Sequence, residues 1–330
     1  SRLGRDARAT FYVLDVSSRI DGKVSVVIPA YKAAATIGKA VRSGLDDAAV
    51  GEIIVVLDGP DPALLHAVPK NDRVKTIERP SIAGAPAARN TGLAAAATEF
   101  VMFLDADDYV EGGLIGAMAR AGAARAADLM FGSFVFELPM GRRIAVDIAS
   151  AVKRLDAMSV LREWVGGNFV PCCSVLWRTE FVRRIGGWDE AMLKNQDGEL
   201  VWRACRSKPR IARASAGVGV YVQSDSGHSI SEQVSEEICA QQIAVLADIE
   251  KNLPPEDFRA MTTEAGDRYH RLARIAYYND YAAIGKVAEG AARRLGHRRQ
   301  SGSIWHGMLA RLVGLQRKER LLARLHRRRS

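Results

Sequence analysis

Three aspartates end an apolar stretch of this chain, in the sequence FLDADD from Phe103 to Asp108. An apolar run between an alanine-rich segment and glycines is typical of a buried strand in an α/β sheet, and open sheets of this class bind ligands at the carboxyl ends of their strands. Residues two apart in a strand point the same way, roughly 7 Å apart. We therefore expect Asp105 and Asp107 to converge on one cation, or on a cation and a ribose, and Asp108 to point elsewhere.

Carboxylate oxygens that leave coordination positions open suit Mg²⁺ or Mn²⁺ bound to a substrate diphosphate. The alternative for the same hexapeptide is a solvated acidic turn that only ends the strand.

The elements before this acidic strand alternate between strand and helix. The apolar and β-branched runs at 23–31, 52–62 and 74–77 predict strands, and the helical spacing at 36–47 and the alanine-rich run at 86–97 predict helices. This alternation predicts an α/β fold with a mostly parallel sheet. Further on we expect a helix at 112–127, a strand at 129–137, mixed elements at 156–235, and helices at 236–251, 256–295 and 304–325.

The chain has 330 residues, 48% of them hydrophobic and 26% charged, which is typical of a water-soluble globular protein. No run approaches the 18 or so apolar residues of a membrane span, and residues 1–22 lack the apolar core of a secretion signal. The four cysteines show no metal-binding or disulfide spacing. We expect a cytoplasmic protein with a lead-in at 1–22, two halves of one domain at 23–110 and 111–235, and a helical extension at 236–330.

Positive charge is concentrated in the tail. Residues 286–330 contain 13 Lys or Arg and two Glu, an excess of 11 that is larger than the net charge of +9 for the whole chain. Trp and Leu residues recur at helical spacing within 304–330, which is typical of a basic amphipathic helix at an anionic membrane surface, here the inner face of the membrane. A helix packed on its own domain is the alternative. We expect no nucleic-acid binding, because aromatic residues do not interleave with the basic ones.

Four motifs follow one another in a fixed order. They are VVIPAY ending at Tyr31, VVLDG at 55–59, AARNTG at 87–92, and GGWDE at 186–190 followed by NQDGELVWR. Together with the acidic strand end they resemble glycosyltransferase family 2, the inverting nucleotide-sugar transferases with the GT-A fold. The resemblance covers roughly residues 23–231, and it implies a mixed, mostly parallel sheet flanked by helices.

The resemblance assigns the donor site residue by residue. It implies that Asp58 contacts the base, uracil or guanine, since an ionised carboxylate accepts hydrogen bonds from ring N–H groups. It places Arg89 near the phosphates and Asp107 on the metal, Mg²⁺ or Mn²⁺. Further residues of this expected site are Pro29, Ala30, Tyr31, Asp105 and Ala106 around the nucleotide sugar, and His228 as a second metal ligand. Read without the family, Asp58 is a turn-former, Arg89 a helix-surface charge and His228 a solvated loop residue.

Inversion requires one general base that takes a proton from the acceptor hydroxyl. The family places an Asp, usually preceded by Glu, at the start of a DxxLxxR helix, and this position is Asp197 here. The preceding residue is Gln196, which puts a role for the partner carboxylate in doubt, and Glu199 is a second candidate base. Trp188 and Asp189 should face the acceptor, although a lone Trp is more often part of a core.

These features predict an enzyme that moves a sugar from a nucleotide-diphosphate sugar, with UDP-sugar favoured, to a saccharide or a lipid-linked saccharide. Synthesis of the cell envelope, of extracellular polysaccharide or of glycolipid is the expected setting. A nucleotidyltransferase shares strand-end acids and a metal, but VVIPAYKAA lacks the glycines of its phosphate loop. A non-catalytic nucleotide- or nucleic-acid-binding protein on the same fold is the third possibility.

Overall fold

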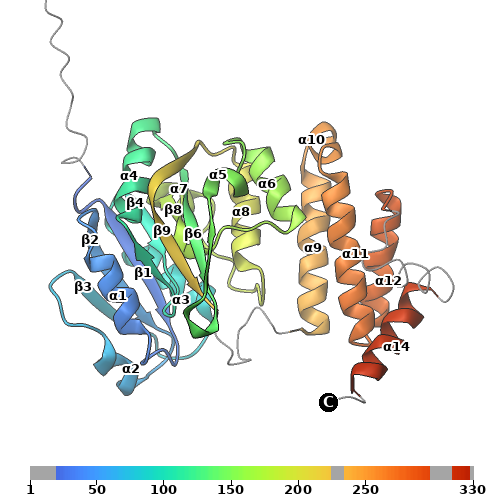
Figure 1. The fold of residues 1–330 in the computed structure, drawn as a ribbon, viewed down its shortest axis with the longest axis horizontal. Helices are drawn as coiled ribbons and strands as arrows, with labels where there is room; N and C mark the ends of the chain where they lie inside the picture. Colours follow the sequence, from blue (N-terminus) through green and yellow to red (C-terminus); the bar gives the residue numbers. More distant parts are fainter. Residues whose placement is uncertain (1–19, 224–233, 298–313, 328–330) are drawn as a thin grey trace, which may run out of the picture.

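The computed structural model describes residues 20–223, 234–297 and 314–327 (Figure 1). Within them, nine strands form one mixed sheet in the order β3-β2-β1-β4-β8-β6-β9-β5, and β7 pairs with β6. The strands are β1 (Val24–Ala30), β2 (Val50–Leu57), β3 (Val74–Glu78), β4 (Phe100–Phe103), β5 (Tyr109–Glu111), β6 (Leu129–Glu137), β7 (Arg143–Val146), β8 (Val175–Arg178) and β9 (Ile211–Val222). The α/β class and the strands expected before residue 140 are confirmed.

The order of the strands creates the place where a ligand can bind. β1, β2 and β3 run parallel and side by side in one direction, and β4 then pairs with the other edge of β1. Open α/β sheets bind ligands at such a switch point, beyond the carboxyl ends of the strands. Here that point lies between the end of β1 and the end of β4, and the three aspartates directly follow β4.

Pro29 lies inside β1, although proline is rare within a strand that has neighbours on both sides. β1 pairs with β4 only as far as Val27 opposite Phe103, and the carbonyl of Val27 accepts the last bond from Leu104. The backbone groups of residue 29 face the β4 side of β1, as those of residue 27 do, and the hydrogen bonds between β1 and β4 have already ended there. The N–H group that proline lacks therefore removes no hydrogen bond from the sheet. The strand can therefore continue through Pro29 to Ala30.

Helices cover both faces of the sheet, because alternate strand residues point to opposite sides. Val26 and Ile28 pack on one side with α1 (Ile37–Leu45), α2 (Pro62–Ala67) and α4 (Leu114–Arg125). Val27 packs on the other side with α3 (Ala85–Ala95), α6 (Ala157–Gly166), α7 (Thr179–Arg184) and α8 (Gln196–Arg206). This second core continues without a break into the helices that follow residue 235.

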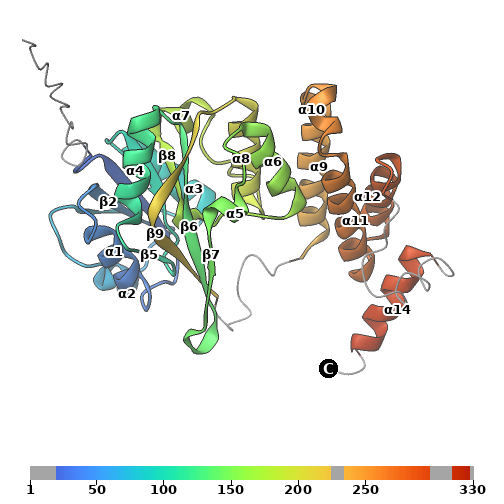
Figure 2. The same ribbon diagram turned by 45° about the horizontal axis from the view of Figure 1, so that its top comes forward.

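Those helices stand beside α6 and α8 (Figures 1 and 2). They are α9 (Glu236–Asn252), α10 (Pro255–Arg259), α11 (Thr262–Tyr278) and α12 (Ala282–Arg294). The sequence predicted helix throughout 256–295, and the structure divides this range in three. One break lies at Met261, which has φ −120° and ψ 13°, and another at Asp280, which has φ +67°. Asn and Asp tolerate the left-handed conformation, so Asn279–Asp280 was the available turn signal.

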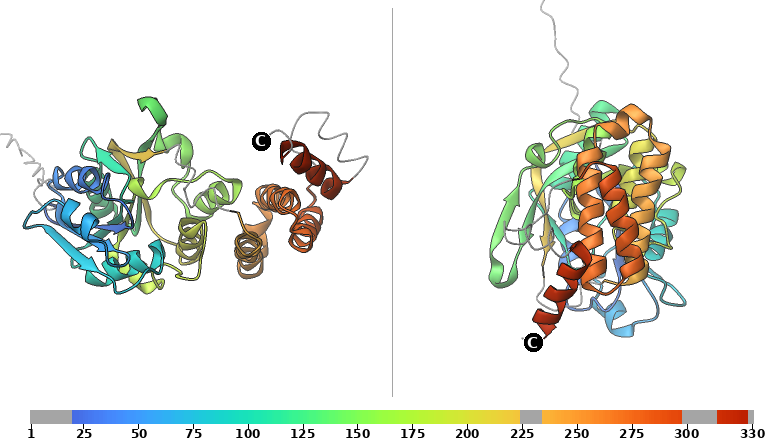
Figure 3. Two further views of the ribbon diagram at one scale, coloured as in Figure 1. Left: turned by 90° about the horizontal axis from the view of Figure 1, so that it is seen from below. Right: turned by 90° about the vertical axis from the view of Figure 1, so that its right-hand side faces the viewer.

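The tail helix α14 (Leu315–Arg327) packs against α11 and is seen apart from the sheet in Figure 3. Its packed face carries a buried ion network, in which Glu319 accepts from Arg274 at 2.7 Å and from Lys318 at 3.1 Å. Leu321 and Leu325 lie on the exposed face. Part of the predicted range 304–325 lies outside the described residues. Among the residues that are described, no helix is both long and apolar enough to cross a membrane.

One histidine of the extension is held neutral by its surroundings. His270 on α11 is 6% exposed, and its ring stacks on His297 with centroids 4.5 Å apart. Burial, His297, Arg274 and Lys318 lower the pKa of His270 to about 4, while Glu289 acts in the opposite direction. A histidine in an unfolded chain has a pKa near 6.5, so the unfolded protein takes up this proton first as the pH falls.

We therefore expect His270 to make the free energy of unfolding fall as the pH is lowered from about 6.5 to about 4. The shift in pKa corresponds to a loss of at most about 3 kcal/mol. Urea unfolding of the native protein and of His270→Gln at several pH values measures it, and the native protein should lose more stability over this window. Equal losses in both proteins would contradict the prediction.

Candidate active site

The three aspartates after β4 take three different environments. Asp105 is partly exposed and accepts a hydrogen bond from Arg89 at 2.6 Å. Asp107 is exposed, but nearby protein atoms displace part of its hydration and, with the charge of Asp105, raise its pKa. Asp108 is 2% exposed and accepts from the backbone N–H of Val222 at 2.9 Å, which fixes the end of β9 to the acidic loop. Burial and then the neighbouring carboxylates raise the pKa of Asp108 well above its usual value.

Arg89 on α3 connects the acidic strand end to the start of α8. One guanidinium nitrogen donates to Asp105 at 2.6 Å and another donates to the side-chain oxygen of Gln196 at 3.0 Å. The guanidinium carbon lies 4.4 Å from the centre of the Trp188 ring, and the side chain is 5% exposed. The charge is fully buried and held in one orientation by two polar partners and one aromatic face, which a planar guanidinium suits.

Asp197 lies in the first turn of α8, directly after Gln196. Burial raises the pKa of its carboxyl group, the positive charge of Arg89 lowers it, and Asp105 raises it again, with a net increase. Asp105 acts in the same way on Asp107. The charge of Asp105 thus acts on both of the other carboxylates, so the strand-end acids and the helix-start acid belong to one cluster. A carboxylate with a raised pKa at a helix N-terminus is suited to accept a proton.

The charges of this cluster do not balance. Asp105, Asp107, Asp108 and Asp197 are four acids, and Arg89 is the cation whose charge acts on Asp105 and Asp197. A diphosphate would meet net negative charge here unless a divalent cation came with it. Mg²⁺ commonly binds through one or two carboxylates and completes its shell with substrate phosphates and water. The exposed carboxylate of Asp107 fits this use, and among the described residues no cluster of three His, Cys, Asp or Glu forms a complete protein cage.

Asp58 follows β2 and orders the loop at 79–84. It is 5% exposed and accepts from Arg79 at 3.1 Å and from the backbone N–H groups of Ala83 and Gly84 at 3.0 and 2.7 Å. A carboxylate has about four acceptor positions, so one position remains for a ligand. The contact with a base stays a prediction. Pro29 and Ala30 are buried at the end of β1, and Tyr31 beyond them is 51% exposed.

Trp188 does not offer a stacking face to an acceptor. Its side chain is 3% exposed, one side is covered by Arg89, and Phe103 packs edge-on at 5.1 Å. The predicted contact with an acceptor sugar is therefore wrong for this side chain as it is placed here, and the alternative of a packed Trp holds. Asp189 is exposed and accepts from the N–H of Ala191 at 2.9 Å, so its acceptor role stays a prediction.

Asn90 holds the Trp188 loop in position. Its amide donates to the carbonyl of Trp188 at 2.9 Å, and its side-chain oxygen accepts from the N–H of the same residue at 2.8 Å. Gly187, with φ +66°, allows this approach, because a Cβ there would lie 2.6 Å from the Asn90 oxygen. Of the two neighbouring motif residues, Arg89 thus contacts the side chain of Trp188 and Asn90 binds its backbone.

Glu199, the second candidate base, is occupied. It is 8% exposed and both of its oxygens bind Arg203, one of them at 2.6 Å. Arg203 in turn donates to the carbonyl of Gly187 at 2.7 Å. This pair ties α8 to the Trp188 loop, which leaves Asp197 as the acid of the first turn that faces the cluster.

Sequence reasoning missed several residues of this site. Tyr221 at the end of β9 has its pKa raised to about 12, first by burial and then by the acidic cluster, and Cys172 lies close enough for Asp197 and Arg89 to act on its thiol. Gln241 on α9 accepts from the N–H of Leu193 and donates to the carbonyl of Ala191, on the loop that leads into α8. Tyr221 ends a predictable strand, but Gln241 carried no signal. His228 lies outside the described residues.

The domain model of "Glycosyl transferase family 2" matches residues 25–181. This range contains β1 to β4, the acidic strand end and Arg89. Residues 25–181, just under half of the chain, therefore match glycosyltransferase family 2.

Curated relatives cover part of the chain. The pre-mycofactocin glycosyltransferase of Mycobacterium tuberculosis is 30% identical over 196 residues, which are 57% of this chain and 40% of that protein. The succinoglycan biosynthesis protein ExoO of Rhizobium meliloti is 29% identical over 141 residues, 42% of this chain and 40% of that protein. The chain therefore spans about two fifths of the length of these relatives.

Solved structures agree in fold over nearly the whole chain. Residues 1–349 of TarS from S. aureus align with a TM-score of 0.62 at 17% identity, covering 93% of this chain and 92% of that one. The mannosyltransferase PcManGT from Pyrobaculum calidifontis, in complex with GDP-Man and Mn²⁺, gives 0.54 at 14% identity, covering 92% and 86%. The predicted GT-A fold is confirmed. The TarS alignment extends beyond residues 25–181 into the helical extension.

Proposed function

We propose that this protein is an inverting glycosyltransferase that moves a sugar from a nucleotide-diphosphate sugar to an acceptor hydroxyl, with Mg²⁺ or Mn²⁺ at the donor. The observation that carries the proposal is the link from Asp105 through Arg89 to Gln196, which brings Asp197 beside the acids after β4. The match of residues 25–181 to glycosyltransferase family 2 supports the reaction class.

The donor pocket lies beyond the ends of β1, β2 and β4. Asp58 retains one acceptor position for a ring N–H of the base, and Tyr31 offers an exposed aromatic face. We favour a UDP-sugar, in agreement with a TarS structure in complex with UDP-GlcNAc, which aligns with a TM-score of 0.56 at 16% identity. PcManGT holds GDP-Man, and guanine offers the same ring donor, so a GDP-sugar is the alternative.

The chemistry is divided between the two ends of the cluster. Asp107 would hold the cation, and a bound divalent ion would supply Lewis-acid stabilisation for the charge of the departing nucleoside diphosphate. Arg89 lies behind Asp105 and fixes the position of that carboxylate beside the donor. Asp197 accepts the proton of the acceptor hydroxyl as that oxygen attacks the anomeric carbon from the side opposite the leaving group. A raised pKa makes Asp197 a stronger base than an exposed aspartate.

The acceptor in this proposal is a saccharide or a lipid-linked saccharide of cell-envelope or extracellular polysaccharide synthesis, the setting that the printed name of ExoO gives for that protein. A membrane contact of α14, which would suit a lipid-linked acceptor, is part of this proposal, and its basis is that Leu321 and Leu325 lie on the exposed face beside Arg317 and Arg324. This face can rest on an anionic membrane surface while the opposite face stays packed on α11.

We expect UDP with Mn²⁺ to raise the Tm more than UDP alone, and Asp107→Asn to lose the metal-dependent part of this rise. A ligand at 100 times its Kd stabilises a protein by about 2.7 kcal/mol. Asp46→Asn, which changes an exposed carboxylate on the far end of α1, is the matched control and should respond as the native protein does. Absence of any shift with UDP or GDP, with or without metal, would favour a non-catalytic scaffold.

Asp197→Asn should lower sugar transfer by about 10² to 10⁴-fold, the usual contribution of a general base, with nucleotide stabilisation unchanged. In the native protein, the acid limb of kcat/KM should lie above the pKa of an ordinary aspartate. Arg89→Gln removes the charge that lowers the pKa of Asp197, so this limb should move to higher pH.

Arg206→Gln, an exposed arginine later on α8, is the control for the loss of one positive charge and should leave the limb in place. An Asp197→Asn protein that transfers sugar at the native rate would remove Asp197 as the base. Transfer of the nucleotidyl group in place of the sugar would identify a nucleotidyltransferase.

Leu321→Gln with Leu325→Gln should reduce co-sedimentation with anionic vesicles at least about fivefold, because both side chains would otherwise enter the membrane interface. Leu65→Gln, at an exposed leucine of α2, is the matched control. Deletion of residues 304–330 should abolish the binding. If the native protein does not sediment with the vesicles, or if the deletion has no effect, the membrane proposal fails.

A further inference from the structure

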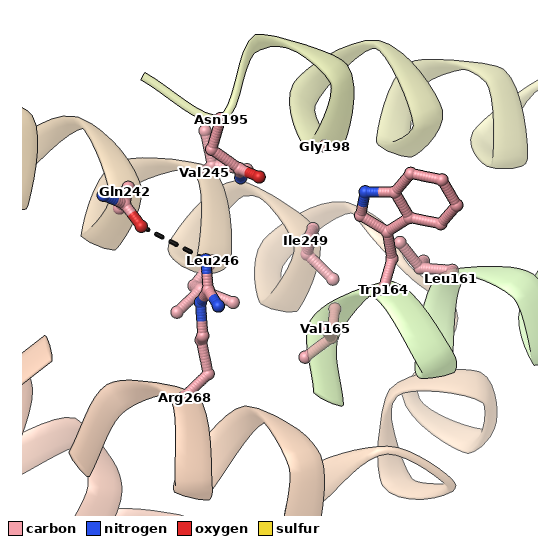
Figure 4. Close-up of a pocket in the computed structure, with 10 residues that line it drawn as sticks. All are labelled: Leu161, Trp164, Val165, Asn195, Gly198, Gln242, Val245, Leu246, Ile249 and Arg268. Carbon is pink, nitrogen blue, oxygen red and sulfur yellow. Dashed lines mark hydrogen bonds between the residues drawn. The ribbon is translucent and has the colours of Figure 1, made fainter. Parts of the chain in front are cut away.

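A cavity of about 30 Å³ lies between the sheet domain and the helical extension (Figure 4). It is more than the space that one water needs. Its walls come from α6, α8, α9 and α11, and they are apolar at Leu161, Trp164, Val165, Val245, Leu246 and Ile249. Its polar lining is formed by Asn195, Gln242 and Arg268. Gly198 also lines it, and the carboxamide of Asn195 occupies the place that a side chain at position 198 would take.

Arg268 on α11 brings an uncompensated positive charge to this cavity. Its guanidinium donates a hydrogen bond to the side-chain oxygen of Gln242 at 3.2 Å, and it forms no ion pair within 4.0 Å with a carboxylate of the described residues. Arg271, which donates to the carbonyl of Gly166, adds a second positive charge. Burial and Arg271 lower the pKa of Arg268. A buried charge with only a neutral amide partner is costly unless a further group completes its shell.

The other polar groups of the cavity can also donate hydrogen bonds. The indole N–H of Trp164 is a donor, and in Figure 4 its nitrogen faces the carboxamide of Asn195 across the cavity. Gln242 turns its oxygen to Arg268, which leaves its NH₂ group as a donor. Asn195 carries a second amide NH₂ group. Donors and a guanidinium around apolar walls form a site for an oxyanion.

We propose that this cavity binds a phosphate group, held by Arg268 with the side chains of Trp164, Asn195 and Gln242. The bound group is either a free phosphate ion or the phosphate of an ester whose apolar part rests on Val165 and Ile249. The site is separate from the nucleotide site, because Asn195 and Gly198 face the cavity while Gln196 and Asp197 face the acidic cluster.

A phosphate in this cavity would stabilise the first turn of α8, where the proposed base lies. Asn195 precedes that turn with φ +58°, a conformation that asparagine tolerates, and its carboxamide lies over Gly198. A group bound to Asn195 and Arg268 would connect this turn to α11. The site does not depend on the proposed function, since it can be tested without any sugar transfer.

The test is thermal unfolding of the full chain in a titration with inorganic phosphate and, separately, with butyl phosphate, at constant ionic strength. We expect a saturable rise of about 2 °C or more in Tm for the native protein and for Arg206→Gln, and no rise for Arg268→Gln. In phosphate-free buffer, Arg268→Gln should unfold at the same or a higher temperature than the native protein, because it removes an uncompensated buried charge.

The two ligands distinguish the sources of the phosphate. Saturation by butyl phosphate at a lower concentration assigns the site to a phosphate ester, and saturation by inorganic phosphate at an equal or lower concentration assigns it to the free ion. The proposal is overturned if the native protein shows no saturable rise, or if the rise persists in Arg268→Gln.

Discussion

The buried guanidinium of Arg89 is the interaction on which the arrangement of the site depends. Its charge is 5% exposed, and it is stabilised by an ion pair with Asp105 and a hydrogen bond from its other end to Gln196. Loss of either partner would leave this buried charge uncompensated and would strongly destabilise the protein. The folded state therefore keeps both contacts. The end of β4 and the start of α8, about 90 residues apart in sequence, are held together in this way.

The same interaction explains why Trp188 is buried. The indole supplies the aromatic face under the guanidinium and packs edge-on against Phe103 of β4. Asn90, the residue after Arg89, binds both backbone groups of Trp188. Gln196 offers Arg89 a neutral oxygen where the family usually has a glutamate. Among Asp105, Gln196 and Asp197, only the two aspartates therefore carry a negative charge that interacts with Arg89. The departure noted in the sequence thus leaves more of that charge to act on the proposed base.

Sequence patterns predicted the parts of this fold that depend on local periodicity. The strands ending at Ala30, Leu57 and Phe103 were visible as apolar runs, and their ends placed Asp58 and Asp105 at one edge of the sheet. A core position for Trp188 was one of the two expectations, but its partner was not predictable, because the ring packs under an arginine 99 positions earlier in the chain. Gln241 was not predictable either, since a surface glutamine and a bridging glutamine look alike in a sequence. The turn at Asp280 had a local signal, but helical periodicity on both sides outweighed it.

The helical extension is part of the machinery that positions the proposed base, and its contacts explain why. α9 binds the loop before α8 through Gln241, and it binds α8 itself through Asp248, which accepts from the indole N–H of Trp202 at 2.7 Å. Trp202 is 2% exposed, so without α9 this N–H and an apolar face of α8 would lose their partners. The apolar core also runs from the sheet through α6 and α8 into α9 and α11 without interruption. A helix that carries a base must keep its first turn within a fraction of an ångström, and loops alone rarely provide that rigidity. In this protein α3 holds one side of that turn through Arg89, and the extension holds the loop that leads into it.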